Sequence, residues 1–413
     1  MDYSKLKNDN GLYLYQDDNF STINMQLTFF ADGEDKEEVV RYLLCDYLLK
    51  SNKKYNTKNN EINRRMRELY SMNIQAATQK IGSKNNIVFY VDMICPKVAG
   101  ENYLKEAYEL IRNLMLYPDF TNEKILETVK RNYIVDKMDK LSDVNKKAKQ
   151  LFYVNTFSDA VGKYIYSTDI NYIVDVVNSV TLEDLERTYK KVFSEESFYR
   201  GIVFGNISEE EFKLFREYFP FKSSMQDLDY SKNNTVFEKK TEVIDENTNE
   251  SIVYVTYKIN HVPEDVSKLL GGILNYSSGL CYRILREKYG LVYSSYAVIF
   301  QYTDALTFKA KIDKKNINKL LEAVDEIVGI ITNKEKLKDL LIFIKKYIKN
   351  EYYLMSEKKD DMFDEIDDYI RGIDGKYSDF IDKIDSYTEE DIIRYTKSMK
   401  KANVFIYKGG YNE

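Results

Sequence analysis

Arg286 and Tyr293 are the two side chains whose types and spacing best fit joint chemistry. They lie seven residues apart, on either side of Gly290, in the stretch L-R-E-K-Y-G-L-V-Y-S-S-Y-A at Leu285–Ala297. A guanidinium group and a phenol both donate hydrogen bonds, so together they could hold a peptide carbonyl. A plainer interpretation is an amphipathic helix that ends at a glycine and runs into an edge strand.

A helix-to-strand corner would have to position this pair. Leu270–Arg283 has the Leu, Ile and Tyr spacing of a buried helix, and Ser294–Gln301 alternates as a strand does. Gly290 stands between the two, where a helix commonly ends. We therefore expect both side chains at one turn of the chain.

The remaining candidates for catalysis are few. His261 is the only histidine, and Pro263 prevents a helix that would align it with the acidic residues that follow. Cys45, Cys95 and Cys281 are widely spaced, which predicts neither a disulfide framework nor a CxxC metal site. One histidine and three scattered cysteines also argue against a Cys-His hydrolase.

Composition and length exclude several classes of protein. The 413 residues predict two or more domains, and a net charge of -6 gives no basic surplus for nucleic acid. No apolar run approaches the roughly 18 residues of a membrane span, and the polar N-terminus lacks the core of a signal peptide. These features and the unpaired cysteines predict a soluble, cytoplasmic protein. We attribute the 37 tyrosines to an AT-rich coding genome and not to binding.

The order of the predicted elements is that of an α+β fold. An N-terminal domain is expected at 1–221, a polar linker at 222–250 and a C-terminal domain at 251–413. The predicted strands are Gly11–Tyr15, Ile23–Phe30, Met72–Gln79, Asn86–Cys95, Phe198–Phe204, Ile252–Ile259, Ser294–Gln301, Ala305–Ile312 and Val404–Tyr407. The predicted helices are Glu37–Lys50, Glu61–Tyr70, Gly100–Leu116, Thr121–Leu141, Asn145–Tyr153, Thr181–Phe193, Pro263–Arg283, Asn316–Ile331 and Lys334–Met355.

The two domains are predicted to be copies of one unit. S-V-T-L-E-D-L at Ser179–Leu185 is echoed by S-Y-T-E-E-D-I at Ser386–Ile392, 207 residues later. Each of these segments opens a helix that precedes a strand and a glycine near the domain end. Similarity at a fixed offset indicates an internal repeat of about 200 residues.

Two tandem units with L-R-E-K-Y-G-L-V-Y in the second resemble the family of pitrilysin, insulinase and the mitochondrial processing peptidase. The resemblance covers essentially the whole chain. It implies two homologous α/β-sandwich domains of the LuxS/metallopeptidase-like type, which form half of a clamshell. It also implies that Arg286 and Tyr293 bind the substrate backbone and that the tyrosine helps to stabilise the tetrahedral intermediate.

The zinc motif of this family is missing from the first unit. Active members carry H-x-x-E-H on the first helix. The register set by the following L-L-K puts Tyr42 at the place of the first histidine, Cys45 at that of the glutamate and Asp46 at that of the second histidine. Cys45 and Asp46 are adjacent on a helix and diverge by about 100°, so they cannot rebuild the site. The region of the third ligand offers Glu127 or Asp136. We expect no metal bound by this chain.

The resemblance therefore implies the metal-free subunit of a heterodimeric zinc endopeptidase. A homologous partner would supply the H-x-x-E-H zinc site, and the substrate would be an extended peptide. S-N-K-K-Y-N-T-K and R-E-L-Y, within residues 51–70, also resemble a Gram-positive cytosolic group of the family whose zinc-bearing partners are encoded beside them. The alternatives are a non-catalytic structural or peptide-binding protein of the same fold, or a leader-peptide recogniser.

Overall fold

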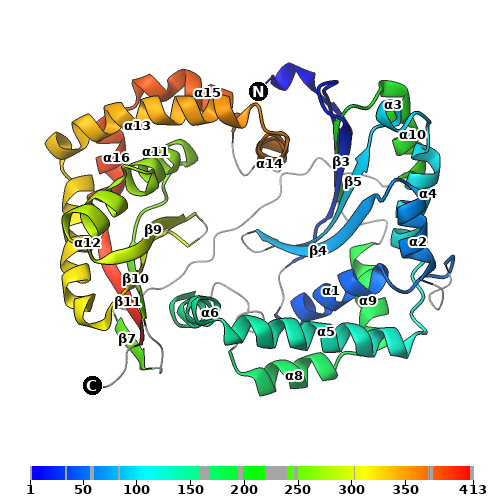
Figure 1. Ribbon diagram of the computed structural model, residues 1–413, viewed down its shortest axis with the longest axis horizontal. Coiled ribbons are helices and arrows are strands. Elements are labelled where there is room, and N and C mark those ends of the chain that lie inside the picture. Colours follow the sequence, from blue (N-terminus) through cyan, green and yellow to red (C-terminus); the bar gives the residue numbers. More distant parts are fainter. Residues whose placement is uncertain are drawn as a thin grey trace. The chain divides into compact units, whose positions relative to one another are not determined.

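The computed structural model describes residues 2–32, 35–55, 60–81, 84–157, 168–193, 199–219, 240–245, 250–301, 303–370, 372 and 375–409. The chain divides into two compact units. The first consists of Met1–Lys140 and Gly162–Ser231, and the second of Leu141–Val161 and Lys232–Glu413. Each unit has its own mixed sheet with helices packed on it (Figure 1).

The first unit is built on a six-stranded sheet with the order β1-β2-β6-β3-β5-β4. β2 and β6 are parallel, whereas the other neighbours are antiparallel. The central strands β3 and β5 are apolar and mostly buried, as strands covered by other elements are. The strands are β1 (Leu6–Asp9), β2 (Leu12–Gln16), β3 (Thr22–Phe29), β4 (Asn73–Ile81), β5 (Lys84–Ile94) and β6 (Tyr199–Gly205).

The helices of the first unit share one hydrophobic core with this sheet. α1 packs against β4, β5 and α9, and buries Leu43, Leu44 and Tyr47 completely. Such burial of an apolar helix face is the main stabilising contribution to an α+β layer. The helices are η1 (Tyr3–Lys5), α1 (Asp35–Leu48), α2 (Glu61–Glu68), α3 (Pro96–Ala99), α4 (Leu104–Leu116), α5 (Glu123–Ser142), α8 (Ile170–Asn178), α9 (Leu182–Val192) and α10 (Glu209–Tyr218).

The second unit is built on a five-stranded sheet with the order β7-β11-β8-β10-β9, so β9 is an edge strand. β7 and β11 are parallel, and the other neighbours are antiparallel. The strands are β7 (Lys240–Asp245), β8 (Ser251–Lys258), β9 (Val292–Phe300), β10 (Ala305–Ile312) and β11 (Lys400–Lys408).

Helices cover both faces of the second sheet. α11, α12, α13 and α16 lie on one face (Figure 1), where Val253 and Val255 of β8 join their core. α6 packs on β8 and β11 from the other face, in a cluster that contains Tyr254. The helices are α6 (Val144–Phe157), α11 (Glu264–Asn275), η3 (Cys281–Lys288), η4 (Lys314–Asn316), α12 (Ile317–Ile331), α13 (Lys334–Met355), α14 (Lys359–Ile370), α15 (Tyr377–Lys383), η5 (Ile384–Ser386) and α16 (Glu389–Thr396).

The two units have the same strand topology. The order β2-β6-β3-β5-β4 in the first matches β7-β11-β8-β10-β9 in the second, with one parallel pair at the corresponding place. The echoed sequences also have the same structure, because Thr181 and Thr388 each form a capping box with the aspartate three residues later. The predicted α+β duplication is therefore confirmed, and the first unit adds β1.

The chain changes units at places that the predicted boundaries 1–221, 222–250 and 251–413 do not mark. α6 lies inside the first predicted range but packs on the second sheet, where Phe152 stacks on Tyr254 with ring centroids 4.2 Å apart. Local sequence patterns carry no signal for so distant a partner. Within the predicted linker, residues 240–245 form β7, and residues 222–239 and 246–249 lie outside the described residues.

Several helical regions differ from the prediction. The helix expected over Pro263–Arg283 is interrupted, because α11 ends at Asn275 and η3 begins at Cys281. The intervening segment contains two serines and a glycine, which are weak helix formers. No helix was predicted for the residues that form α8, α10, α14 and α15. Among the described residues, no helix is both long and apolar enough to cross a membrane.

Candidate functional site

The corner around Gly290 is formed by η3 and β9. η3 is a π-helix, a rare form that is frequent at functional sites. Gly290 has a φ of +61°, a left-handed conformation that glycine adopts readily. The turn closes with backbone hydrogen bonds from Tyr289 N–H to Ile284 O (3.2 Å), from Gly290 N–H to Arg286 O (3.0 Å) and from Leu291 N–H to Leu285 O (2.9 Å).

Buried and polar contacts fix this corner on the second unit. Leu285, Leu291 and Val292 are buried in the core that α11, α12 and α13 share. Lys288 Nζ and the Tyr289 hydroxyl both donate to the Glu326 carboxylate on α12, each at 2.7 Å. These bonds lower the pKa of Glu326, and the bond from Lys288 has the largest effect. The corner is therefore held from both its apolar and its polar side.

A β-bulge turns Tyr293 outward. Along β9, Ser294 pairs with Lys311 whereas Val292 pairs with Ile312, so Tyr293 is an extra residue in the ladder. Bulges bend the strand and redirect a side chain. Val292 is buried, whereas Tyr293 and Ser294 are both exposed, Tyr293 with 66% of its surface. The bulge thus exposes the phenol to solvent instead of burying it in the core.

Arg286 lies one helical turn from Tyr282 and is also exposed. Its guanidinium carbon is 5.5 Å from the centre of the Tyr282 ring, within the range of a cation–π contact. Since stacking on the ring leaves guanidinium N–H groups available, Arg286 can still donate to a carbonyl. The structure brings Arg286 and Tyr293 to the adjoining ends of η3 and β9.

The first unit contains a second copy of this corner without the tyrosine. R-E-L-Y at 67–70 takes the place of R-E-K-Y at 286–289. Ser71 N–H donates to Arg67 O (3.2 Å), Met72 N–H donates to Met66 O (3.1 Å), and Ser71 has a positive φ of 55°. Seven residues after Arg67 stands Ile74, which is buried on a strand of unbroken register. An exposed tyrosine on a bulge is therefore particular to the second unit.

The three degenerate zinc-motif positions lie on α1. Tyr42 packs edge to face on Tyr133 of α5, with ring centroids 4.7 Å apart. Cys45 is buried, and this burial raises the pKa of its thiol, which disfavours the thiolate that binds metals. Asp46 pairs with Lys50 one turn later. These side chains thus serve packing and ion pairing.

The other candidate ligands also have partners. Glu127 pairs with Lys130 at 3.1 Å, and Asp136 pairs with Lys140 at 2.6 Å. His261 lies in the loop between β8 and α11, where its Nδ1 is 3.6 Å from Asp304 Oδ1. Within the part of the chain that the structure describes, no three His, Cys, Asp or Glu side chains come together in a group able to hold a metal ion.

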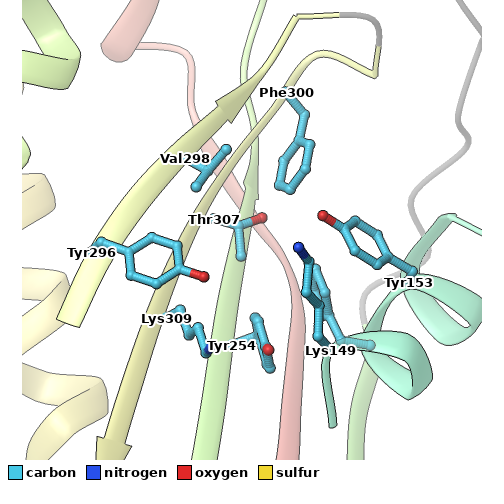
Figure 2. A pocket seen from close by; sticks show the side chains of 9 residues that line it. Lys149, Tyr153, Tyr254, Tyr296, Val298, Phe300, Thr307 and Lys309 are labelled. Atoms are coloured by element: carbon cyan, nitrogen blue, oxygen red, sulfur yellow. The ribbon is translucent and has the colours of Figure 1, made fainter. Parts of the chain in front are cut away.

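The sequence did not point to a cavity of about 220 Å³ in the second unit. Side chains of α6, β8, β9 and β10 line it, and Figure 2 shows several hydroxyl and amino groups that point into it. Its lining residues are Lys149, Phe152, Tyr153, Tyr254, Tyr296, Val298, Phe300, Thr307 and Lys309. The alternation of Tyr296, Val298 and Phe300 on one face of β9 was the only local signal for it.

Comparison with known sequences identifies the segment around the corner. Residues 179–339 match the family model described as the peptidase M16 inactive domain. This part of the chain belongs to the M16 peptidases. The match confirms the family resemblance that L-R-E-K-Y-G-L-V-Y carried, and the word inactive agrees with the missing zinc motif. No curated protein matches the sequence.

Several solved structures have the same fold over nearly the whole chain. A conserved protein from Enterococcus faecalis aligns with a TM-score of 0.80 at 17% identity, over 98% of both chains. A peptidase M16 inactive domain from Pseudomonas fluorescens aligns with a TM-score of 0.73 at 11% identity, over 97% of this chain and 96% of that one. The periplasmic protease PqqL from Escherichia coli aligns with a TM-score of 0.71 at 12% identity, over 96% of this chain and 44% of PqqL.

Proposed function

We propose that this chain is the metal-free subunit of a heterodimeric zinc endopeptidase. Arg286 and Tyr293 complete the active site of a homologous partner, which carries the H-x-x-E-H zinc motif. The substrate is an extended peptide. The observation that carries the proposal is the bulge in β9, which exposes Tyr293 beside Arg286 where the equivalent corner of the first unit buries Ile74.

The absence of a metal motif from α1 supports a division of labour between two chains. Tyr42, Cys45 and Asp46 replace the two histidines and the glutamate of the motif, and they do not provide the three protein ligands and the open water position that a catalytic zinc requires. An exposed arginine and tyrosine with no metal nearby have no obvious use alone. They would contribute to catalysis when another chain brings zinc.

The length of PqqL also supports this arrangement. The present chain aligns with only 44% of that protease, so a protease can contain such a unit beside a further part of similar or greater length. In a heterodimer, two separate chains supply what a longer protease holds in one. Without a partner of this kind, the chain would be a binding or structural protein of the same fold.

In the proposed complex the two side chains act on the scissile carbonyl and its neighbours. Arg286 donates charged hydrogen bonds to the peptide backbone and fixes its position. Tyr293 donates its O–H to the carbonyl oxygen, where negative charge develops as the peptide bond is attacked. The partner would supply the zinc and the general base that activate water. This chain thus contributes binding and transition-state stabilisation but no proton transfer.

We further propose a cytoplasmic location. Cys45, Cys95 and Cys281 are free thiols and all are buried. Free cysteines are typical of reducing compartments. Fractionation of cells that express the chain would test this, and recovery from the periplasm or medium would overturn it. PqqL is described as periplasmic, so the fold itself does not favour either compartment.

The test is reconstitution with a zinc-motif homologue of similar size from the same genome. We expect the pair to cleave an extended peptide and either chain alone to be inactive. Tyr293→Phe should lower kcat by roughly 10²–10³-fold, the loss seen when one oxyanion donor is removed. Tyr353→Phe is the matched control, because Tyr353 on α13 is equally exposed, at 63% against 66%.

Three results would overturn the proposal. The first is unchanged turnover in Tyr293→Phe. The second is stoichiometric zinc in the isolated chain, which would contradict the metal-free assignment. The third is a homodimer with no zinc-motif partner in pull-down experiments, which would favour a structural or peptide-binding protein.

A further inference from the structure

The cavity beside β9 carries an inference about which peptide residue the second unit recognises. All its lining residues belong to the second unit, with Lys149 and Tyr153 on α6, Tyr254 on β8 and Lys309 on β10. Its volume of about 220 Å³ is below the roughly 300–1,000 Å³ of a typical small-molecule pocket. A space of this size suits one side chain or one chain end.

Two lysines give the cavity positive charge. Lys309 Nζ lies 5.7 Å from the Tyr254 ring centre and 5.4 Å from that of Tyr296, and Lys149 Nζ lies 5.6 Å from that of Tyr153. Neither ammonium group forms a salt bridge with a carboxylate of the described residues. Burial lowers the pKa of Lys309, as expected for an ammonium group that lacks a close counter-charge.

The acid that acts most strongly on Lys309 is engaged elsewhere. The charge of Asp143 partly offsets the effect of burial on Lys309. Its Oδ1 accepts from Lys146 N–H at 2.9 Å, in the first turn of α6. A carboxylate in this place is an ordinary helix cap and stays with the helix. The cavity therefore keeps a surplus of positive charge.

Tyr254 provides a second and independent sign of a missing ligand group. Only 4% of the surface of Tyr254 is exposed, and its hydroxyl has no hydrogen-bond partner among the residues that the structure describes. A buried hydroxyl without a partner costs about 1–3 kcal/mol, so such groups are normally satisfied. Since Tyr254 lines the cavity, a ligand that enters it can accept this hydrogen bond.

We propose that this cavity binds a carboxylate of the extended peptide, either an Asp or Glu side chain or a C-terminal carboxylate. Lys149 and Lys309 supply the positive charge, the Tyr254 hydroxyl donates a hydrogen bond, and the rings of Tyr153 and Tyr296 contact the apolar part of the residue (Figure 2). That the carboxylate belongs to a substrate peptide rests on the function proposed above.

The position of the cavity relative to Tyr293 sets the spacing. Tyr296 lies three residues along β9 from Tyr293, and a strand rises 3.2–3.4 Å per residue. The bulge places Tyr293 and Ser294 on the side of β9 opposite the buried Val292 and Ala297, the side that Tyr296 also faces. The recognised carboxylate is thus at least about 10 Å, or three or more extended residues, from the carbonyl that Tyr293 contacts.

Binding to the chain without a partner tests this inference separately from catalysis. The probes are fluorescent peptides of about a dozen residues that alternate Thr and Ala, with a central Glu or Gln and an amidated C-terminus, and the Gln peptide with a free C-terminal carboxylate. We expect the Glu peptide, the free-acid peptide or both to bind at least about tenfold more tightly than the amidated Gln peptide, the typical effect of a charged hydrogen bond. The two carboxylate probes distinguish a side chain from a chain end.

Substitutions of the cavity residues test whether these side chains cause the preference for a carboxylate. Lys149→Met/Lys309→Met should abolish the preference for a carboxylate, and Tyr254→Phe should reduce it about threefold to tenfold. Lys338→Met/Lys346→Met removes the same charge from the exposed face of α13 and should leave the preference intact. Lys309→Arg keeps the charge and should retain part of the preference, which guards against a loss that reflects misfolding.

Several results would overturn the inference. One is equal binding of all three peptides to the wild-type chain, and another is binding of none. A third is a preference that survives in Lys149→Met/Lys309→Met. Tyr293→Phe serves to separate the two proposals, since it should lower kcat with the partner by roughly 10²–10³-fold but leave the carboxylate preference of the isolated chain unchanged.

Discussion

Asn275 forms two hydrogen bonds with the backbone of Ala297. Its Nδ2 donates to Ala297 O at 2.8 Å, and its Oδ1 accepts from Ala297 N–H at 2.7 Å. The side-chain amide of the last residue of α11 therefore occupies the outer edge of β9, as a neighbouring strand would. Free strand edges invite pairing with other chains, and proteins commonly cover them. A substrate strand along β9 would have to displace Asn275 at this point.

Asn275→Ala should destabilise the second unit by about 1–2 kcal/mol, because two backbone groups lose partly buried partners. It should also promote self-association at the uncovered edge. Denaturant unfolding and sedimentation measure these two effects. Asn260→Ala is the control, since Asn260 only contacts the exposed Ser398 and should change stability by less than about 0.5 kcal/mol. Equal effects of both variants would contradict the role of Asn275.

Arg286→Lys should lower kcat/KM of the reconstituted pair about tenfold or more. Lysine keeps the charge but loses the planar fork of donors, and a charged hydrogen bond contributes roughly 1.5–3 kcal/mol. Arg283→Lys is the matched control, because Arg283 is an exposed arginine on the same π-helix. If both variants lose activity equally, the effect lies in the helix and not in the grip on the substrate.

Gly205→Ala should destabilise the first unit by more than about 3 kcal/mol. Gly205 has a φ of +126°, and a Cβ atom there would lie 2.2 Å from the backbone oxygen of Thr22 on β3. Gly100→Ala provides the comparison, since Gly100 has a φ of +78° with open space around it and should cost only about 1–2 kcal/mol. Thermal unfolding distinguishes the two, and equal losses would show that backbone strain alone decides.

The sequence predicted the fold well where the signal is local. Alternation and helical spacing identified most of the strands and the longer helices of both units, and the echo of Thr181 in Thr388 revealed the duplication. The predicted boundaries placed α6 in the first domain, whereas it packs on the second sheet. The contact of Phe152 with Tyr254 joins residues about a hundred positions apart. Long-range pairing of apolar faces is not encoded in local periodicity.

The sequence predicted the site less completely than the fold. The motif around Gly290 marked the corner, but nothing in it showed that Tyr293 is a bulge residue, which depends on the register with β10. The cavity was missed because the abundant tyrosines were attributed to coding bias. Tyr254 and Tyr296 stand on separate strands, and only the folded sheet brings them together with Lys309.

Lys137 should make the first unit more stable as the pH rises. It lies on α5, and burial lowers its pKa from 10.5 to about 8. The folded chain therefore releases a proton that the unfolded chain keeps between pH 8 and pH 10.5. Because the unfolded state binds more protons in this window, the free energy of unfolding increases across it. Below pH 8 the charged, buried ammonium carries its full cost.

Lys137→Met should accordingly raise the free energy of unfolding at pH 7 by about 1–3 kcal/mol, and this gain should shrink steadily from pH 8 to pH 10.5. Denaturant unfolding over this pH range provides the measurement. Lys140→Met is the control, because Lys140 is exposed and pairs with Asp136 at the surface, so its removal should change stability by less than about 1 kcal/mol at any pH. A gain for Lys137→Met that stays constant with pH would show that packing, and not the buried charge, accounts for it.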